Sequence, residues 1–150
     1  MQINIPLPPS GSSAFKTRIW KSSIPPKIKH FFWRVLSGAI GSSTELSRRG
    51  IPIDHTCQRC SSASESINHL LFECPHSRSV WRQSNTIFSG SQAQDNSLEE
   101  NIEVLLPRYD RSTSKEIQLL PFWICWQLWK SRNALIFNKE IWSTYRTRQC

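Results

Sequence analysis

The chain has 150 residues with a formal net charge of +8, and 38% of its residues are hydrophobic while 20% are charged. This length suffices for one domain with a core, and this balance argues against an intrinsically disordered chain. No apolar run approaches the roughly 20 residues that span a bilayer, and residues 1–13 lack the pattern of a secretory signal. We therefore expect an intracellular protein with no membrane partner.

The cysteines and the charges are both unevenly distributed. Five cysteines are an odd number, and three of them cluster with a histidine, which favours thiols that bind metal over a secreted disulfide framework. Residues 1–50 hold eight Lys or Arg against one acidic residue, whereas residues 51–100 hold three against six. A basic first third favours nucleic acid through contacts with phosphates, and a merely solvated basic surface is the alternative.

The first half of the chain predicts a lead-in followed by short helices. Residues 1–13 are rich in Pro and Ser and predict a disordered segment. A helix is predicted from Pro26 to Ser37, because proline is tolerated at a helix start and apolar residues recur there at helical spacing. A second short helix is predicted after a cap at Ser42 or Ser43, and Gly50 ends it.

The second half predicts a further helix from Pro75, a polar linker over residues 84–97, a short helix from Leu98 to Leu106 and a long helix from Lys115 to Asn138. The long helix carries an aromatic stripe, and such a stripe usually belongs to the core. The stripe comprises Leu119, Phe122, Trp123, Trp126, Trp129, Asn133 and Phe137. The predicted fold class is therefore mainly α, as a small helical domain with an inserted CCHC-type zinc knuckle.

The knuckle is predicted from the pattern C-x2-C-x8-H-x4-C, formed by Cys57, Cys60, His69 and Cys74. Two cysteines separated by two residues can place both sulfurs toward one point, and thiolate and imidazole are the ligands that tetrahedral zinc prefers. Four protein ligands leave no open position for water or substrate, so the predicted Zn²⁺ site is structural rather than catalytic.

Two other histidines flank this cluster and are alternatives for the fourth ligand. His55 is too close to Cys57 to close the ring well, whereas His76 is only two residues beyond Cys74 and is the more serious rival. Cysteines that pack as small apolar residues without any metal are the remaining alternative.

Several short motifs follow one another along the chain. They are Trp20-Lys21, Ile24 to Lys29, Phe32-Trp33-Arg34, Arg49-Gly50-Ile51, Cys57-x-x-Cys60, Glu65 to Leu70 and Phe72 to Pro75 with Val80-Trp81. In this order and spacing they resemble a known family, the zinc-binding domain found after the reverse transcriptase in plant LINE-type (non-LTR) retrotransposons. The resemblance covers about residues 15 to 85.

A later stretch, Trp126 to Asn133 followed by Ile136 to Asn138, resembles the helical link that such elements carry before a ribonuclease H domain. The expected organisation is thus a lead-in over 1–13, a reverse transcriptase zinc-binding-like domain over 14–83, a linker over 84–97 and a helical C-terminal segment over 98–150.

The resemblance implies zinc ligands at the four positions above and a role in holding nucleic acid near a polymerase, with the nucleus as the guessed compartment. We find no paired-aspartate polymerase motif and no convincing carboxylate set for a two-metal nuclease, so we expect a non-enzymatic piece of a retroelement polyprotein. Six cations are the expected phosphate contacts, with little sequence preference. They are Lys16, Arg18, Lys21, Lys27, Lys29 and, on the knuckle, Arg59.

Two other functions compete with this one. The alternative to nucleic-acid binding is a structural or protein-interaction domain that docks a partner through the aromatic C-terminal helix, or a decaying remnant without a cellular function. An enzyme with Cys57 or Cys74 as nucleophile is the weakest alternative, because no acid–base or oxyanion constellation accompanies these thiols.

Overall fold

The computed structural model describes residues 12–84, 96–106 and 114–148, with side chains described from Ala14 to Ile136 within these ranges. Residues 1–11 of the predicted lead-in and residues 85–95 of the predicted linker lie outside the described residues, whereas Ser12 and Ser13, expected in the lead-in, begin α1. Within the described ranges the chain is helical, without strands apart from one isolated bridge, so the mainly α prediction is confirmed. The elements are α1 (Ser12–Lys21), α2 (Pro26–Leu36), α3 (Ser43–Arg48), the π-helical turn η1 (His69–Glu73), α4 (Pro75–Gln83), α5 (Leu98–Leu105) and α6 (Lys115–Arg148).

Most helices begin where the sequence predicts them. Pro26 and Pro75 stand at the first position of α2 and α4, where their missing N–H needs no partner. Ser42 caps α3 by accepting a hydrogen bond from the Glu45 N–H (3.3 Å). Two differences are notable: α1 was not predicted as a helix, and α6 continues past Asn138 to Arg148.

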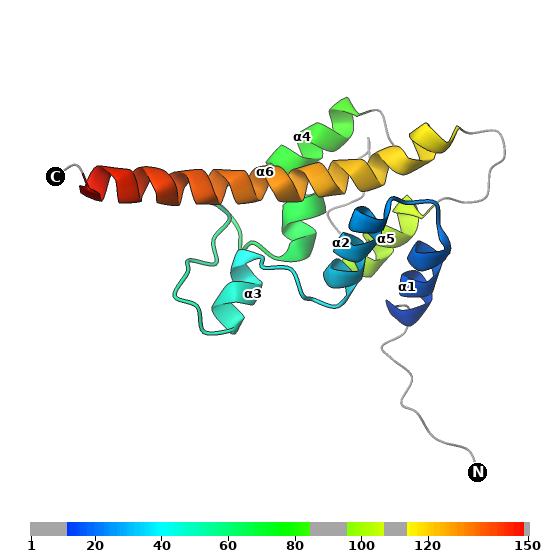
Figure 1. Ribbon diagram of the computed structural model, residues 1–150, viewed down its shortest axis with the longest axis horizontal. Coiled ribbons are helices and arrows are strands. Elements are labelled where there is room, and N and C mark those ends of the chain that lie inside the picture. The colour runs from blue at the N-terminus through cyan, green and yellow to red at the C-terminus, as the bar shows by residue number, and fades with distance from the viewer. Residues whose placement is uncertain (1–11, 85–95, 107–113, 149–150) are drawn as a thin grey trace, which may run out of the picture.

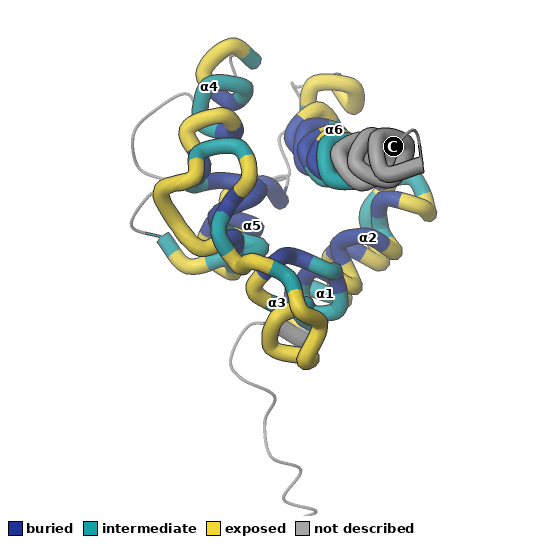
Figure 2. Tube along the Cα trace, turned by 90° about the vertical axis from the view of Figure 1, so that its left-hand side faces the viewer, coloured by how far each residue is buried: buried dark blue, intermediate teal, exposed yellow. Residues whose placement is uncertain are grey.

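Figure 1 shows α6 running along the length of the molecule, with α1, α2 and α3 on one side of it. The direct packing partners of α6 are α2 and η1, while α1 packs on α2 and α4 on η1. Figure 2, viewed along α6, shows the buried parts of these elements facing a common interior. No helix in the described part of the chain combines the length and the apolar character needed to cross a bilayer.

Aromatic side chains form the centre of the core. Phe32 of α2 meets Phe122 of α6 edge to face, with ring centroids 5.2 Å apart, and both are fully buried. Phe31 extends this contact to Trp126 and Trp129 (5.4 and 6.2 Å). The stripe on α6 therefore packs on the core as predicted. Its tryptophans remain half-buried, however, and Phe137 lies outside the described side chains.

A buried ion pair ties α6 to the loop that follows α3. The Arg132 guanidinium donates to the Glu65 carboxylate through Nε (3.2 Å) and Nη2, and through Nη1 to the Gly41 carbonyl (3.0 Å). The same carboxylate accepts from both the N–H and the hydroxyl of Ser43 (2.9 and 3.0 Å). Arg132 and Glu65 are only 5% and 2% exposed. Such a network is costly to break, because each lone partner would be a buried uncompensated charge.

We expect Arg132→Met to lower the free energy of unfolding by about 3–5 kcal/mol, since it leaves the Glu65 carboxylate buried and unpaired. Adding Glu65→Gln should restore part of that loss, because the neutral amide still accepts from Ser43. Urea denaturation followed by circular dichroism measures both. Arg48→Met, which removes an exposed partner of Glu45, is the control and should leave the midpoint nearly unchanged. A double variant no more stable than Arg132→Met alone would contradict this account.

Candidate metal centre

A small hairpin presents the first two predicted ligands. Thr56 and Ser64 form the isolated antiparallel bridge, and the N–H of Cys57 donates to the carbonyl of Ala63 (2.8 Å). The turn closes where the N–H of Ser61 donates back to the Cys57 carbonyl (2.9 Å), with Ser61 in the left-handed region at φ 57°. This reversal brings Cys57 and Cys60 to the same side of the hairpin tip.

The other two predicted ligands stand at the ends of the π-helical turn η1. The N–H of Cys74 donates to the carbonyl of His69, five residues earlier (2.8 Å). A π-type bond spans five residues, which is the separation between the histidine and cysteine of H-x4-C. The turn begins with a second bond, from the His69 N–H to the hydroxyl of Ser66 (3.0 Å).

The π turn leaves two buried carbonyls that the backbone does not satisfy. Cys74 donates to His69 rather than to Leu70, and Pro75 has no N–H to offer to Leu71. Side chains of α4 supply the missing donors: the Ser77 hydroxyl donates to the Leu70 carbonyl, and the Trp81 indole N–H donates to the Leu71 carbonyl (2.8 Å). These two bonds hold α4 against η1 and so fix the position of the last cysteine.

The structure brings the four predicted side chains together. Their ligand atoms all lie within 4.8 Å of one another, with Cys57 Sγ 3.9 Å from Cys74 Sγ and Cys60 Sγ 3.4 Å from His69 Nε2. A zinc tetrahedron with ordinary bond lengths has edges of about 3.8 Å between two sulfurs and about 3.6 Å between sulfur and nitrogen. The donor set and its spacing therefore fit a tetrahedral metal ion.

The two rival histidines are not part of this cluster. His55 and His76 are both exposed, whereas His69 is 5% exposed with Nε2 turned to the sulfurs. The other ring nitrogen of His69, Nδ1, lies 4.0 Å from a carboxylate oxygen of Glu73. Glu73 in turn accepts a hydrogen bond from the Asn68 amide (2.6 Å). A carboxylate on the far side of a ligating imidazole favours the tautomer that leaves Nε2 free for a metal.

The environments of Cys74 and Cys60 shift the pKa values of their thiols in opposite directions. Burial raises the pKa of Cys74 to about 11, although the backbone amides of His76 and Ser77 at the start of α4 oppose this effect. For Cys60, burial also pushes the pKa upward, but hydrogen bonds from Ser62, and then from His69 and Cys57, outweigh it and lower the pKa to about 6. Cys60 thus offers a thiolate at neutral pH, whereas Cys74 would release its proton to a bound metal.

The predicted phosphate contacts lie on α1, on α2 and on the hairpin that carries Cys57. Arg18 and Lys21 are exposed on α1, and Lys16 on the same helix lies over the ring of Trp33 (4.9 Å to the centroid). Lys29 on α2 donates a hydrogen bond from Nζ to the backbone carbonyl of Trp20 (2.8 Å). Its ammonium therefore lies at the C-terminal end of α1, where the helix dipole favours a positive charge.

The remaining two predicted contacts lie next to α6. Lys27 stands over the rings of Trp123 and Trp126, with centroids 5.5 and 5.9 Å away. Arg59 donates from Nη2 to the hydroxyl of Ser131 (2.7 Å) and so links the hairpin to α6. Five of the six cations therefore belong to the α1–α2 pair, and two of the six, Lys27 and Arg59, also have partners on α6.

Residues outside the predicted site support its geometry. Ser77 and Trp81 complete the π turn, and the Glu65–Arg132 pair anchors the loop that leads to His69. One signal in the sequence points to the first two: a proline directly after the last cysteine removes a backbone donor that a nearby side chain must replace. No local signal pairs Glu65 with Arg132, since 67 positions separate them.

Comparison with known proteins agrees with this geometry. The family model described as zinc-binding in reverse transcriptase matches residues 7–81, which is half of the chain. The chain belongs to this family. It is also 28% identical over 142 residues to a putative ribonuclease H protein of Arabidopsis thaliana, covering 89% of this chain but only 22% of that protein. No solved structure gives a significant match. The resemblance to reverse transcriptase zinc-binding domains of plant retroelements is thus confirmed.

We expect Ser77→Ala to destabilise the protein by about 1–3 kcal/mol, because the buried Leu70 carbonyl loses its donor. Ser79→Ala is a matched control on the same helix, since the Ser79 hydroxyl only accepts an exposed hydrogen bond from Gln83. Its effect should stay within about 0.5 kcal/mol. Urea denaturation measures both variants, and equal midpoints would show that the Ser77 bond does not support the π turn.

Proposed function

We propose that this chain is a zinc-binding, non-catalytic module derived from a retrotransposon polyprotein, and that it binds nucleic acid with little sequence preference. The observation that carries the proposal is the convergence of three thiols and one imidazole within 4.8 Å in a chain of the reverse transcriptase zinc-binding family. Cys57, Cys60, His69 and Cys74 are the proposed ligands.

Zinc is the metal that this donor set favours. Thiolate and imidazole ligands in tetrahedral array suit zinc, whereas magnesium and calcium prefer oxygen. With all four positions filled by the protein, no position remains for a reacting water, so the metal would join the hairpin to η1 without catalysing a reaction. The chemistry that the ion supplies is cross-linking of these two segments, and the family membership of the chain supports this assignment.

Binding of nucleic acid is supported by the charge of the first two helices. Together α1 and α2 carry six Lys or Arg and no acidic residue. Release of counterions from phosphates would drive such binding, and contacts with phosphates carry no sequence information. The relative in Arabidopsis thaliana is described as a putative ribonuclease H protein, a class that acts on nucleic acid, and the present chain spans about a fifth of it.

The second candidate function is docking of a protein partner through α6. Its tryptophans at 123, 126 and 129 are half-buried and packed against the core. They are therefore neither fully buried nor available as a free apolar face. Among the side chains of α6 that the structure describes, the exposed large hydrophobic residues are Ile117 (64%) and Leu120 (40%), near its N-terminal end. Two such side chains make a small apolar surface, so the described part of α6 supports the nucleic-acid proposal more than docking of a protein partner.

Elemental analysis of protein purified without added metal should give close to one zinc per chain. His69→Ala should weaken zinc retention during dialysis against a chelator, because it removes one of four ligands. His76→Ala is the matched control and should retain zinc as the unchanged protein does. Weakened retention in His76→Ala with full retention in His69→Ala would transfer the ligand role to His76, and absence of zinc with intact thiols would end the metal proposal.

Affinity for a nucleic-acid duplex should fall steeply with salt, as a straight line of log association constant against log salt concentration. Arg18→Gln on α1 should make the slope shallower by about one, because one phosphate contact is lost. Arg82→Gln, which removes another exposed guanidinium, from α4, should leave the slope unchanged. Fluorescence anisotropy over a salt series measures both, and identical slopes for the two variants would contradict a contact surface on α1.

A further inference from the structure

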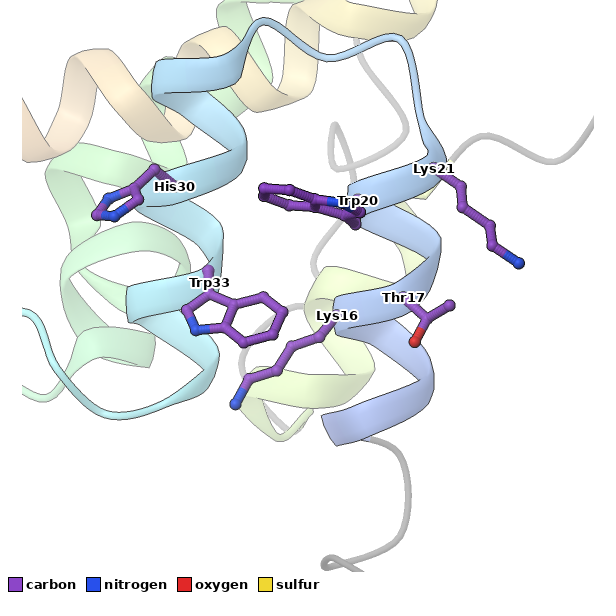
Figure 3. A pocket seen from close by; sticks show the side chains of 6 residues that line it. All are labelled: Lys16, Thr17, Trp20, Lys21, His30 and Trp33. Atoms are coloured by element: carbon purple, nitrogen blue, oxygen red, sulfur yellow. The ribbon is translucent and has the colours of Figure 1, made fainter.

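An open groove lies between α1 and α2, away from the candidate metal centre, with a volume of about 490 Å³. Figure 3 shows two indole rings projecting into it from opposite sides, Trp20 from α1 and Trp33 from α2, with the Lys16 side chain alongside Trp33. The residues that line the groove are Lys16, Thr17, Trp20, Lys21, His30 and Trp33.

The two tryptophans are unusual for this molecule. Trp20 is 64% and Trp33 45% exposed, and they are the most exposed tryptophans among those that the structure describes. By contrast, Trp81 is 1% exposed and the tryptophans of α6 pack on the core. Core packing therefore does not explain Trp20 and Trp33, and paired exposed aromatic rings generally mark a binding surface.

The charges around the groove select the kind of ligand. Lys16 and Lys21 line it, Lys29 lies beside Trp20, and neither helix carries an acidic residue. Aromatic side chains beside a basic surface are the combination that binds single-stranded nucleic acid, because each base has a face that stacks on an indole while phosphates follow the cations. A purely apolar partner would gain nothing from these ammonium groups.

Resting upon the nucleic-acid binding proposed above, we infer that the α1–α2 groove is a base-stacking platform for single-stranded nucleic acid, with Trp20 and Trp33 as the stacking rings. The rings meet edge to face at 66° with centroids 6.4 Å apart, so they cannot sandwich one base between parallel faces. Each ring instead stacks with a base of its own, which suits neighbouring bases of an unpaired strand.

The lysines of the groove are placed for the phosphates of such a strand. Lys16 Nζ lies 4.9 Å from the Trp33 centroid and Lys29 Nζ 6.0 Å from the Trp20 centroid. The Lys16 ammonium over the exposed Trp33 ring is held weakly, so an arriving base displaces it to the rim of the ring, where the backbone of that nucleotide passes. Lys29 stays bonded to the Trp20 carbonyl at the edge of the groove and offers its charge from there. In a duplex the bases are stacked on one another in the interior. A duplex can therefore contact these cations through its phosphates but cannot stack its bases on the indole rings.

The test compares two single strands of matched charge that differ in their bases, together with a duplex. The full chain, loaded with zinc, is titrated with a short oligothymidylate, with an abasic sugar-phosphate strand of the same length and with a blunt duplex. We expect oligothymidylate to bind about tenfold more tightly than the abasic strand, because stacking adds to phosphate contacts. Trp20→Ala should remove most of this preference without changing affinity for the abasic strand, whereas Trp20→Phe should retain part of it.

Two controls keep the result specific. Ile117→Ala removes an equally exposed apolar side chain (64%) from α6 and should leave the preference intact. Circular dichroism and zinc content should be the same for all variants, since Trp20 contributes little to the core.

The outcomes separate this inference from the proposal on which it rests. If oligothymidylate and the abasic strand bind equally in both the unchanged protein and Trp20→Ala, the groove is not a stacking platform, yet phosphate binding stands. If none of the three ligands binds, both ideas fail. If Trp20→Ala instead abolishes a self-association seen by sedimentation and leaves oligothymidylate binding unchanged, a second copy of this chain covers the groove and the inference is wrong.

Discussion

The hydrogen bond from the Cys74 N–H to the carbonyl of His69 is the constraint on which the candidate metal centre depends. A regular α-helix would pair residues four apart and would give these two side chains a different relative direction. The π turn moves the pairing to five and sets imidazole and thiol toward the hairpin that carries the other two cysteines. Pro75 favours the π turn, because it has no N–H to continue the backbone hydrogen bonds of η1 and it stands at the first position of α4.

The metal centre is not an isolated knuckle, because four side-chain hydrogen bonds connect it with α4, α5 and α6. Ser77 and Trp81 bind the carbonyls of η1 from α4, Asn101 of α5 donates to the Asn68 side chain (2.9 Å), and Arg59 reaches α6. Loss of metal would therefore be felt first in the hairpin, whose own backbone bonds are few. The helical core, centred on Phe32 and Phe122, has apolar contacts that do not involve the thiols.

The sequence predicts those parts of the structure that depend on neighbouring residues, such as helix starts, caps and the spacing of the ligands. Proline at a helix start and serine at a cap identified α2, α3 and α4, and the ligand spacing identified the cluster near His69. The π turn escaped prediction because the five-residue step in H-x4-C was interpreted only as a ligand spacing. The Glu65–Arg132 pair and the exposed position of Trp20 depend on how distant helices meet, which no local pattern encodes. The boundaries predicted for the domains remain predictions.

The bridge from Arg132 has a consequence for the order in which the molecule assembles. The sulfurs of Cys57 and Cys74 are only 17 positions apart in the chain, whereas Arg132 is separated from Glu65 by 67 positions and from Gly41 by 91. Closing a long loop costs more chain entropy than closing a short one, so distant contacts tend to form late. We therefore expect the knuckle to close early around its ion and α6 to dock last, onto a surface that the short-range contacts have already built.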